Sequence, residues 1–261
     1  MRIFLTTMFL WPACLALAEE PVTLAWNVAE GDSFLLQIVS DRRAEMQSGK
    51  QPLPLATRFQ ITITGALTVG AAAEDGARKF EFSFASLEGT VEALGVKLSI
   101  SEKPEDISGK KISATLSAAG QLTWDEEALK KVAEGIDLNE DFAHLLPALP
   151  KAPVRPNESW EAEVDRHTNT CELVRREVTE KGPTAVLKGK SKADETSGEG
   201  DLKSSLRVDG TFSGEWDLDR GYLRVFDETR TEEAKIVTKD SVLITKSEVK
   251  RRVVLGKVKR D

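Results

Sequence analysis

Hydrophobic and polar residues alternate along most of the chain, and this period of two predicts β-strands. Two alternating segments, about 58–69 and 79–84, flank a turn signal at 74–76 and predict a long β-hairpin. Three phenylalanines share one face of its second strand: Phe80, Phe82 and Phe84. The same alternation continues at 94–100 and at 112–116.

The clearest alternation runs over 202–218, where the apolar residues fall on even positions and include Phe212 and Trp216. Gly210 and Gly214 lie on that apolar face, and glycine within a strand is typical of a bend or a close backbone approach. A returning strand at 222–232 and a strand pair at about 233–239 and 242–255 follow. These segments predict a mainly β fold: a long, curved antiparallel sheet that forms an open half-barrel.

A short insertion, about 125–146, follows helical spacing instead. Asp125 is the predicted N-cap of its first helix, whose apolar side carries Leu129 and Val132. A second short helix is predicted at 138–146, with Phe142 on its apolar side. We expect these helices to cover the aromatic face of the sheet.

Four prolines at three-residue intervals predict an extended segment over 147–156, which cannot be a central strand. This segment joins two halves of similar layout, about 22–124 and 157–255. Two interpretations remain open: a degenerate duplication, or the ordinary similarity of antiparallel meanders. Both predict a single β-rich domain over 19–261.

Residues 1–18 have the features of a cleaved secretory signal peptide, with Ala16 and Ala18 at the small-residue positions before the cleavage site. The alternative is a lipoprotein anchored at Cys14. Cleavage after Ala18 predicts a periplasmic or extracellular protein in which Cys171 is the remaining thiol, so no intramolecular disulfide forms. No later stretch reaches the roughly 18 apolar residues that a transmembrane helix needs.

Composition narrows the function classes. The chain has 36 Lys+Arg, 43 Asp+Glu and only two His and two Cys, so a cysteine-rich scaffold is excluded and a multi-histidine metal enzyme is disfavoured. Its net charge of −7 and its 6% aromatic content argue against nucleic-acid binding. We predict no catalytic residues, no metal site and no cofactor.

Four weak motifs each have a structural alternative that we prefer. His167 and Cys171, near Asp165, have the groups of a zinc site or a Cys–His pair, but a buried thiol and a polar turn are the better explanation. Gly189-Lys190-Ser191 resembles the end of a phosphate-binding loop, but Thr184 replaces the required first glycine. His144 is expected to pack or to cap a helix.

The fourth motif is a set of acids around a turn, at Asp217, Asp219, Asp227 and Glu228. A hydrolase would need two of them to converge in a pocket, at about 5–10 Å. The basic C-terminal end, from Lys250 onward, either contacts anionic lipid or polysaccharide or protects an edge strand from aggregation.

Three segments carry a resemblance to a known family: Trp26 with Glu30-Gly31-Asp32-Ser33-Phe34, residues 146–160 with their Leu-Pro and Glu-Ser-Trp elements, and Gly214 to Gly221. They resemble an uncharacterised family of exported bacterial β-rich proteins, from which the chain departs at Asn157. That family offers no catalytic residues to transfer. More remotely, the layout is similar to periplasmic lipoprotein carriers, which hold acyl chains between a curved sheet and helices.

The leading hypothesis is a non-enzymatic, exported cell-envelope protein that binds a lipid or another apolar ligand between sheet and helices. The predicted lining is Phe80, Phe82, Phe84, Phe212, Trp216, Leu129, Val132 and Phe142. The alternative is a structural or interaction module that binds an envelope partner or polymer through its charged faces. A filled core is the structural alternative to a ligand cavity.

Overall fold

The structure is a computed structural model that describes residues 20–49, 51–74, 76–101, 104–117, 120–132, 138–142, 145–164, 167–198 and 202–258. The predicted signal peptide and Cys14 lie outside the described residues, as do Asp165 and His144. The export prediction therefore stays a prediction.

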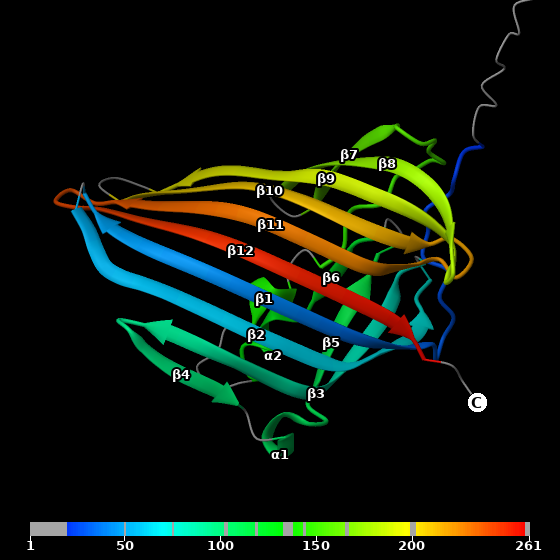
Figure 1. Ribbon diagram of the computed structural model, residues 1–261, viewed down its shortest axis with the longest axis horizontal. Coiled ribbons are helices and arrows are strands. Elements are labelled where there is room, and N and C mark those ends of the chain that lie inside the picture. Colours follow the sequence, from blue (N-terminus) through cyan, green and yellow to red (C-terminus); the bar gives the residue numbers. More distant parts are fainter. Residues whose placement is uncertain are drawn as a thin grey trace, which may run out of the picture.

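Twelve strands form one antiparallel sheet that does not close into a barrel, which confirms the predicted fold class (Figure 1). The strands are β1 (Ser33–Ser48), β2 (Gln51–Ala72), β3 (Arg78–Ala93), β4 (Val96–Ser101), β5 (Lys111–Leu116), β6 (Leu122–Trp124), β7 (Ser159–Val164), β8 (His167–Thr179), β9 (Gly182–Ser197), β10 (Lys203–Asp217), β11 (Tyr222–Val237) and β12 (Val242–Lys257). Their order is β6-β5-β3-β2-β1-β12-β11-β10-β9-β8-β7, and β4 pairs with β3 beside this path.

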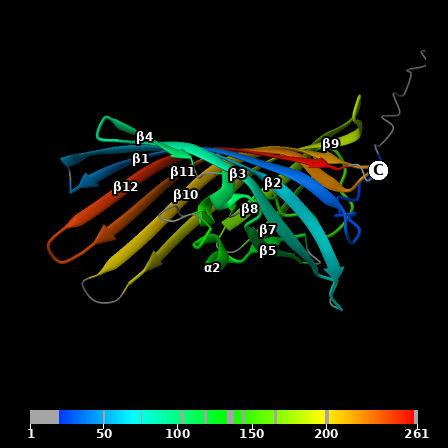
Figure 2. The ribbon, with the colours of Figure 1, turned by 90° about the horizontal axis from the view of Figure 1, so that it is seen from below.

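The two predicted halves of the chain occupy the two halves of this sheet. β1 to β6 lie on one side and β7 to β12 on the other, and they meet where β1 pairs with β12. The sheet is arched, and the insertion between β6 and β7 lies beneath its concave side (Figure 2). This arrangement is continuous across the midline, and the duplication itself stays a prediction.

The insertion contains shorter helices than the sequence predicts. α2 (Glu126–Leu129) begins after Asp125, whose carboxylate accepts a hydrogen bond from Ala128 N at 2.9 Å, as expected for an N-cap. α3 (Asn139–Phe142) is also a single turn, and a further turn, α1 (Pro104–Ile107), precedes β5. Helices this short are not stable by themselves, so their packing against the sheet determines where they end.

The last strands also differ from the prediction. The sequence predicts a break near residue 232, but β11 is continuous to Val237 and pairs with β12 from Val225 to Val237. β12 lies between β1 and β11, in the middle of the sheet. The basic C-terminal segment is therefore no edge strand, which corrects one of the two interpretations of its charge.

The core lies between the concave face and the insertion, and aromatic side chains dominate it. Phe82 contacts Phe84, Trp124 and Phe142, with ring centroids 4.7, 6.3 and 5.5 Å apart. Trp26 packs edge-on against Trp216 at 5.1 Å. Edge-to-face pairs of this kind stabilise a core beyond the effect of their buried area.

Glycines on the concave face let two of these rings lie flat against the backbone. A Cβ added at Gly189 would overlap the ring of Phe212 and approach the backbone oxygen of Thr170. Gly65 has the same relation to Phe82. At Gly210 and Gly214, the positions that the sequence singles out, the approach is less close: an added Cβ would lie 3.0 Å from Arg230 Cβ and 3.2 Å from Leu223 Cδ1.

We predict that Gly189→Ala lowers the free energy of unfolding by about 1–3 kcal/mol, because Phe212 must leave its packed position. Gly256→Ala is the matched control, since Gly256 lies in β12 with no atom within 4 Å of the added Cβ. Urea denaturation of both variants measures the effect. Equal stability of the two variants would contradict the packing role of Gly189.

Candidate functional site

The eight predicted ligand-lining residues all lie in the packed core. Phe80, Phe82, Phe84, Phe212, Trp216, Leu129, Val132 and Phe142 are each buried, with at most 7% of their surface exposed. The structure brings Phe82, Phe84 and Phe142 into one cluster. Phe212 contacts Phe226 on the other half of the sheet instead.

The space between these side chains is nearly filled. Among the described residues, the apolar void beside Phe80, Trp124 and Leu145 has a volume of about 10 Å³. That is about the space one water molecule needs, and far below the size of a ligand pocket. The arrangement fits the filled-core alternative for this half of the sheet, and a ligand-lining role for the eight residues stays a prediction.

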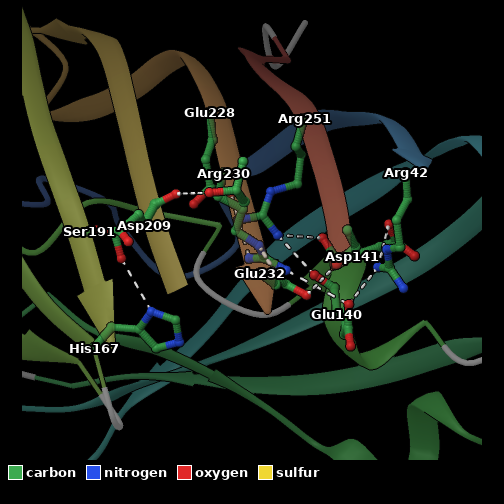
Figure 3. A network of polar contacts seen from close by, with 12 residues as sticks. Arg42, Glu140, Asp141, His167, Ser191, Asp209, Glu228, Arg230, Glu232 and Arg251 are labelled. Atoms are coloured by element: carbon green, nitrogen blue, oxygen red, sulfur yellow. Dashed lines mark hydrogen bonds and ion pairs between the residues drawn. The ribbon is translucent and has the colours of Figure 1, made fainter. Parts of the chain in front are cut away.

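A buried network of charged residues lies where the insertion meets the centre of the sheet (Figure 3). Arg251 Nη2 on β12 lies 2.6 Å from Glu228 Oε2 on β11, and both side chains are almost completely buried. Arg230 Nε contacts Glu232 Oε1 at 2.6 Å, also on β11. Arg42 on β1 completes the set of arginines.

These arginines hold α3 against the sheet. Arg42 Nη2 lies 2.9 Å from Glu140 Oε2 and 3.8 Å from Asp141 Oδ1. Arg251 Nη1 donates to the carbonyl oxygens of Glu140 and Asp141, at 3.0 and 3.3 Å. The carbonyls of a helix's last turn have no partner within the helix, so Arg251 satisfies groups that α3 cannot.

Burial dominates the electrostatics of this network. Loss of hydration raises the pKa of the Asp141 carboxyl above its usual value, against the opposing effects of Arg42, Ser40, Arg251 and Arg230. The complete burial of Arg251 lowers the pKa of its guanidinium, with Glu228 as the main opposing charge. The network is therefore a set of mutually dependent charges.

His167 and Cys171, the groups of the possible zinc site or Cys–His pair, have different surroundings. His167 Nδ1 lies 3.2 Å from Ser191 Oγ. Cys171 is buried, and burial raises the pKa of its thiol to about 12, which disfavours the thiolate that a metal site or a nucleophile needs. The described residues contain no group of three potential metal ligands. Lys190 lies within β9, a strand rather than a phosphate-binding loop.

Three of the four candidate acids, Asp217, Asp227 and Glu228, lie beside a base. Asp217 is buried, with Arg224 Nε 3.6 Å from its Oδ2, and Asp227 Oδ1 lies 3.5 Å from Arg252 Nη1. Among the basic residues at the C-terminal end, Lys250 pairs with Glu248 and Lys257 with Asp32. The basic residues of this segment therefore have acidic partners, one on the same strand and one far away in the sequence.

A groove of about 1050 Å³ lies between β6 and β7, the two ends of the strand order. Trp26, Leu149 and Trp160 line it together with polar side chains. Gln121, next to β6, donates through Nε2 to the carbonyl oxygen of Glu163 on β7 at 2.8 Å. This contact links the two edges directly, and the proline segment lies along the same groove.

The other half of the concave face carries apolar residues without a comparable cover. Opposite residues of neighbouring antiparallel strands share a face, and one such row runs from Arg42 through Phe59 and Val91 to Leu98. Beyond this row the hairpins extend past the insertion (Figure 2). We call this half-exposed set the distal apolar face: Ala44, Met46, Phe59, Val91, Val96, Leu98, Leu206, Ala234, Ile236 and Leu243.

The convex side of the same strands is charged. Residues of both signs line a shallow groove of about 520 Å³ there: Arg43, Glu45, Arg207, Asp209, Glu233, Lys246 and Glu248. The Arg207–Asp209 pair, at 3.0 Å, and the Lys246–Glu233 pair, at 3.3 Å, show that these charges partly neutralise each other. The distal part of the sheet is therefore amphipathic, with an apolar concave face and a charged convex one.

Sequence reasoning identified neither the charged network nor the distal apolar face. A signal for the network exists, because Arg230 and Arg251 occupy the apolar phase of their strands, next to Phe226 and Val253. The signal for the distal face is a difference in length. Strands of 15 or 16 residues are too long for two single-turn helices to cover.

Comparison with known proteins gives no family. No protein-family model matches the chain, so the resemblance to a family of exported proteins stays a prediction, and no curated protein matches either. Solved structures with a similar arrangement include lipovitellin, at 8% identity and a TM-score of 0.49, over 87% of this chain and 25% of lipovitellin. The chain thus spans a quarter of that protein's length.

Two outer-membrane proteins give lower scores. OccK7 (OpdD) of Pseudomonas aeruginosa and an outer membrane channel of Pseudomonas putida F1 are each 7% identical, with TM-scores of 0.27. The matched regions include 88% and 91% of this chain, respectively, and 100% of each of the other two chains. At such scores none of these likenesses bears on what the chain does. Within its described part, the chain has no helix of the length and apolarity needed to span a membrane.

We predict that Arg251→Met lowers the free energy of unfolding by about 3–5 kcal/mol, because it leaves the buried Glu228 without its main partner. The matched control is Arg207→Met, which breaks an exposed pair and should change stability by less than about 0.5 kcal/mol. Chemical denaturation of both variants at neutral pH measures the difference. A similar small loss in both would show that the network does not stabilise the fold.

We predict that Asp141→Asn becomes relatively more stabilising as pH rises. Burial raises the pKa of Asp141 in the folded state above the unfolded value of 3.8. The folded state therefore favours the protonated carboxyl, and ionisation of Asp141 lowers the free energy of unfolding of the wild type. The variant-minus-wild-type unfolding free energy should therefore increase from below pH 3.8 upward and level off above the folded-state pKa. Denaturation at a series of pH values tests this, and a difference that is constant or falls would contradict it.

Proposed function

We propose that the protein is a non-enzymatic, exported cell-envelope protein that binds a lipid or another apolar ligand on its distal apolar face. The observation that carries the proposal is the contrast between the two faces of the distal strands. The site differs from the predicted one, since it lies beyond the insertion rather than between the insertion and the sheet.

The cost of leaving this face in water supports a ligand. Val96 and Leu98 are 58% and 62% exposed, and Ile236 is 42% exposed, on a face that contains other half-exposed apolar side chains. Contiguous apolar surface on a soluble protein is typical of a binding site. Each methylene that a ligand and this face remove together from water contributes about 0.8 kcal/mol.

The shape and polarity of the face favour hydrocarbon chains as the ligand. From Arg42 to Ser48, β1 continues for seven residues, or roughly 23 Å at the rise of a β-strand. One leaflet of a bilayer holds its acyl chains in about 15 Å, so an extended chain fits along the strands. Between the apolar residues lie the small polar side chains of Thr57, Thr245 and Ser247, and a larger polar side chain, Glu195, lies at the margin, opposite Leu206.

A protein in the cell envelope, the location we propose, is surrounded by lipids that could bind to it. The predicted signal peptide implies export, and lipids are the abundant apolar molecules of a cell envelope. The charged network closes the inner end of the face, since Arg42 and Glu232 line its border with the core. An acyl chain would then lie with its polar end toward the hairpins and solvent.

The test is binding of a long-chain fatty acid that carries a fluorescent reporter, followed by titration. We predict that Ile236→Lys weakens binding about tenfold, because it places a charge in contact with hydrocarbon. Val178→Lys is the matched control, since Val178 is 84% exposed and lies outside the face. It should bind as the wild type does.

Two results would overturn the proposal. One is the absence of binding by the wild-type protein, together with no co-purifying lipid in native mass spectrometry. The other is binding that Ile236→Lys leaves unchanged but Phe142→Ala abolishes, with both variants folded, which would return the ligand to the core lining that the sequence predicted.

The charged convex groove supports a second candidate, an interaction module for an envelope partner or polymer. Its lining of three bases and five acids favours a partner with a matching pattern over a simple polyanion. A pull-down from envelope extracts separates the two functions. Lys246→Glu should abolish capture by this groove and leave fatty-acid binding unchanged.

A further inference from the structure

β4 is an edge strand whose outer side carries unusual apolar exposure. It pairs only with β3, from Val96 opposite Ala93 to Ser101 opposite Glu88. Val96 and Leu98 point to the concave side, and Leu94 at the hairpin tip is 67% exposed. Of the exposed large hydrophobic residues in the described part of the chain, these three lie in one hairpin. Natural edge strands are usually blocked by charges, bulges or prolines.

The other edge strands have such protection. β7 has its carbonyl at Glu163 bound by Gln121 and faces the groove of the proline segment. β6 is only three residues long. β4 is regular over six residues and carries a single charge, Lys97. It is therefore the edge on which another strand can extend the sheet.

The hairpin turn determines which backbone groups of β4 face outward. Leu94 and Gly95 have φ values of 52° and 75°, as the two central residues of a type I′ turn require. In such a two-residue hairpin the flanking residues, Ala93 and Val96, form a hydrogen-bonded pair. Because the bonds alternate along an antiparallel ladder, Val96, Leu98 and Ile100 bond inward to β3. Lys97, Ser99 and Ser101 present their N–H and C=O groups to the free edge.

We propose that β4 pairs antiparallel with β4 of a second copy of this chain, about a twofold axis at Leu98. In this register Lys97 of each copy is opposite Ser99 of the other, and both residues have outward-facing backbone groups. Four inter-chain hydrogen bonds form, and Val96 is opposite Ile100 of the second copy. Every concave residue of the strand thus meets an apolar residue, and every lysine meets a serine.

Neighbouring registers are less complementary. An axis at Lys97 places two ammonium groups directly opposite each other, which destabilises a strand pair. An axis at Ser99 would allow six inter-chain hydrogen bonds. It leaves Val96 of each copy beyond the end of the partner's strand, which stops at Ser101, so this exposed apolar side chain has no partner. An axis between two residues is excluded, because opposite residues of an antiparallel pair must share a face.

The dimer would join the two distal apolar faces into one continuous concave surface. This inference does not depend on ligand binding, because it rests on the edge of the sheet and not on what lies on its face. A six-residue pairing buries little area, so we expect a dissociation constant in roughly the micromolar range.

Cysteine trapping tests the register. At a twofold axis a residue is opposite itself, with Cα atoms about 4.5 Å apart in a non-hydrogen-bonded pair, a distance a disulfide can span. We predict that Leu98→Cys forms a covalent dimer under mild oxidation. Ser99→Cys, one residue away and also exposed, should not, since its own copy lies beyond the reach of a disulfide. The experiment uses the chain without residues 1–18, which removes Cys14; the other native thiol, Cys171, is buried and does not compete.

Analytical ultracentrifugation over a range of concentrations tests the dimer itself. Leu98→Lys should raise the dimer dissociation constant at least about tenfold, because it opposes two ammonium groups at the axis, whereas Val178→Lys should leave it unchanged. A wild-type protein that stays monomeric overturns the proposal. This is the result expected if a different partner covers the edge of β4. A dimer that Leu98→Lys leaves intact, or one that Ser99→Cys traps in place of Leu98→Cys, also overturns it.

Discussion

The insertion between β6 and β7 covers only part of the concave face, and this limit determines the character of the whole molecule. Strands of about 16 residues extend for roughly 53 Å, whereas each helix beneath them is a single turn of four residues. A single sheet buries its apolar side only where something lies against it. The structure therefore has a packed half with an aromatic core and a distal half with the same alternation and no comparable cover.

The charged network lies at the boundary between these halves. Arg251 binds both a carboxylate on β11 and the last carbonyls of α3, so a single side chain connects the sheet to the helix. Buried ion pairs of this kind contribute little net stability compared with apolar packing, but removal of one partner is costly. Their geometric demands place α3 at one position on the sheet, and Phe142 next to Phe82 with it.

The sequence predicted the fold well because alternation is a local property. The hairpin of β2 and β3, the long β10 and the cap at Asp125 all follow from neighbouring residues. The predicted site depended on a different kind of information. Phe82 and Phe142 do meet, but whether a void remains in the core depends on the volumes of all surrounding side chains, and the void beside Phe80 and Trp124 has only about 10 Å³. Alternation also continued β11 through residue 232, where its charged residues suggested a break.

The sequence alone determined most of the strands, the apolar side of each strand and the place of the insertion, but not the lengths of its helices or the continuity of β11. Only the tertiary structure decided which part of that apolar side is covered. The pairing of β1 with β12 places residues more than 200 positions apart on one surface, and pattern along the chain contains no information about such neighbours. The same reason applies to Arg42, Arg230 and Arg251, which are scattered charges in the sequence and one network in the fold.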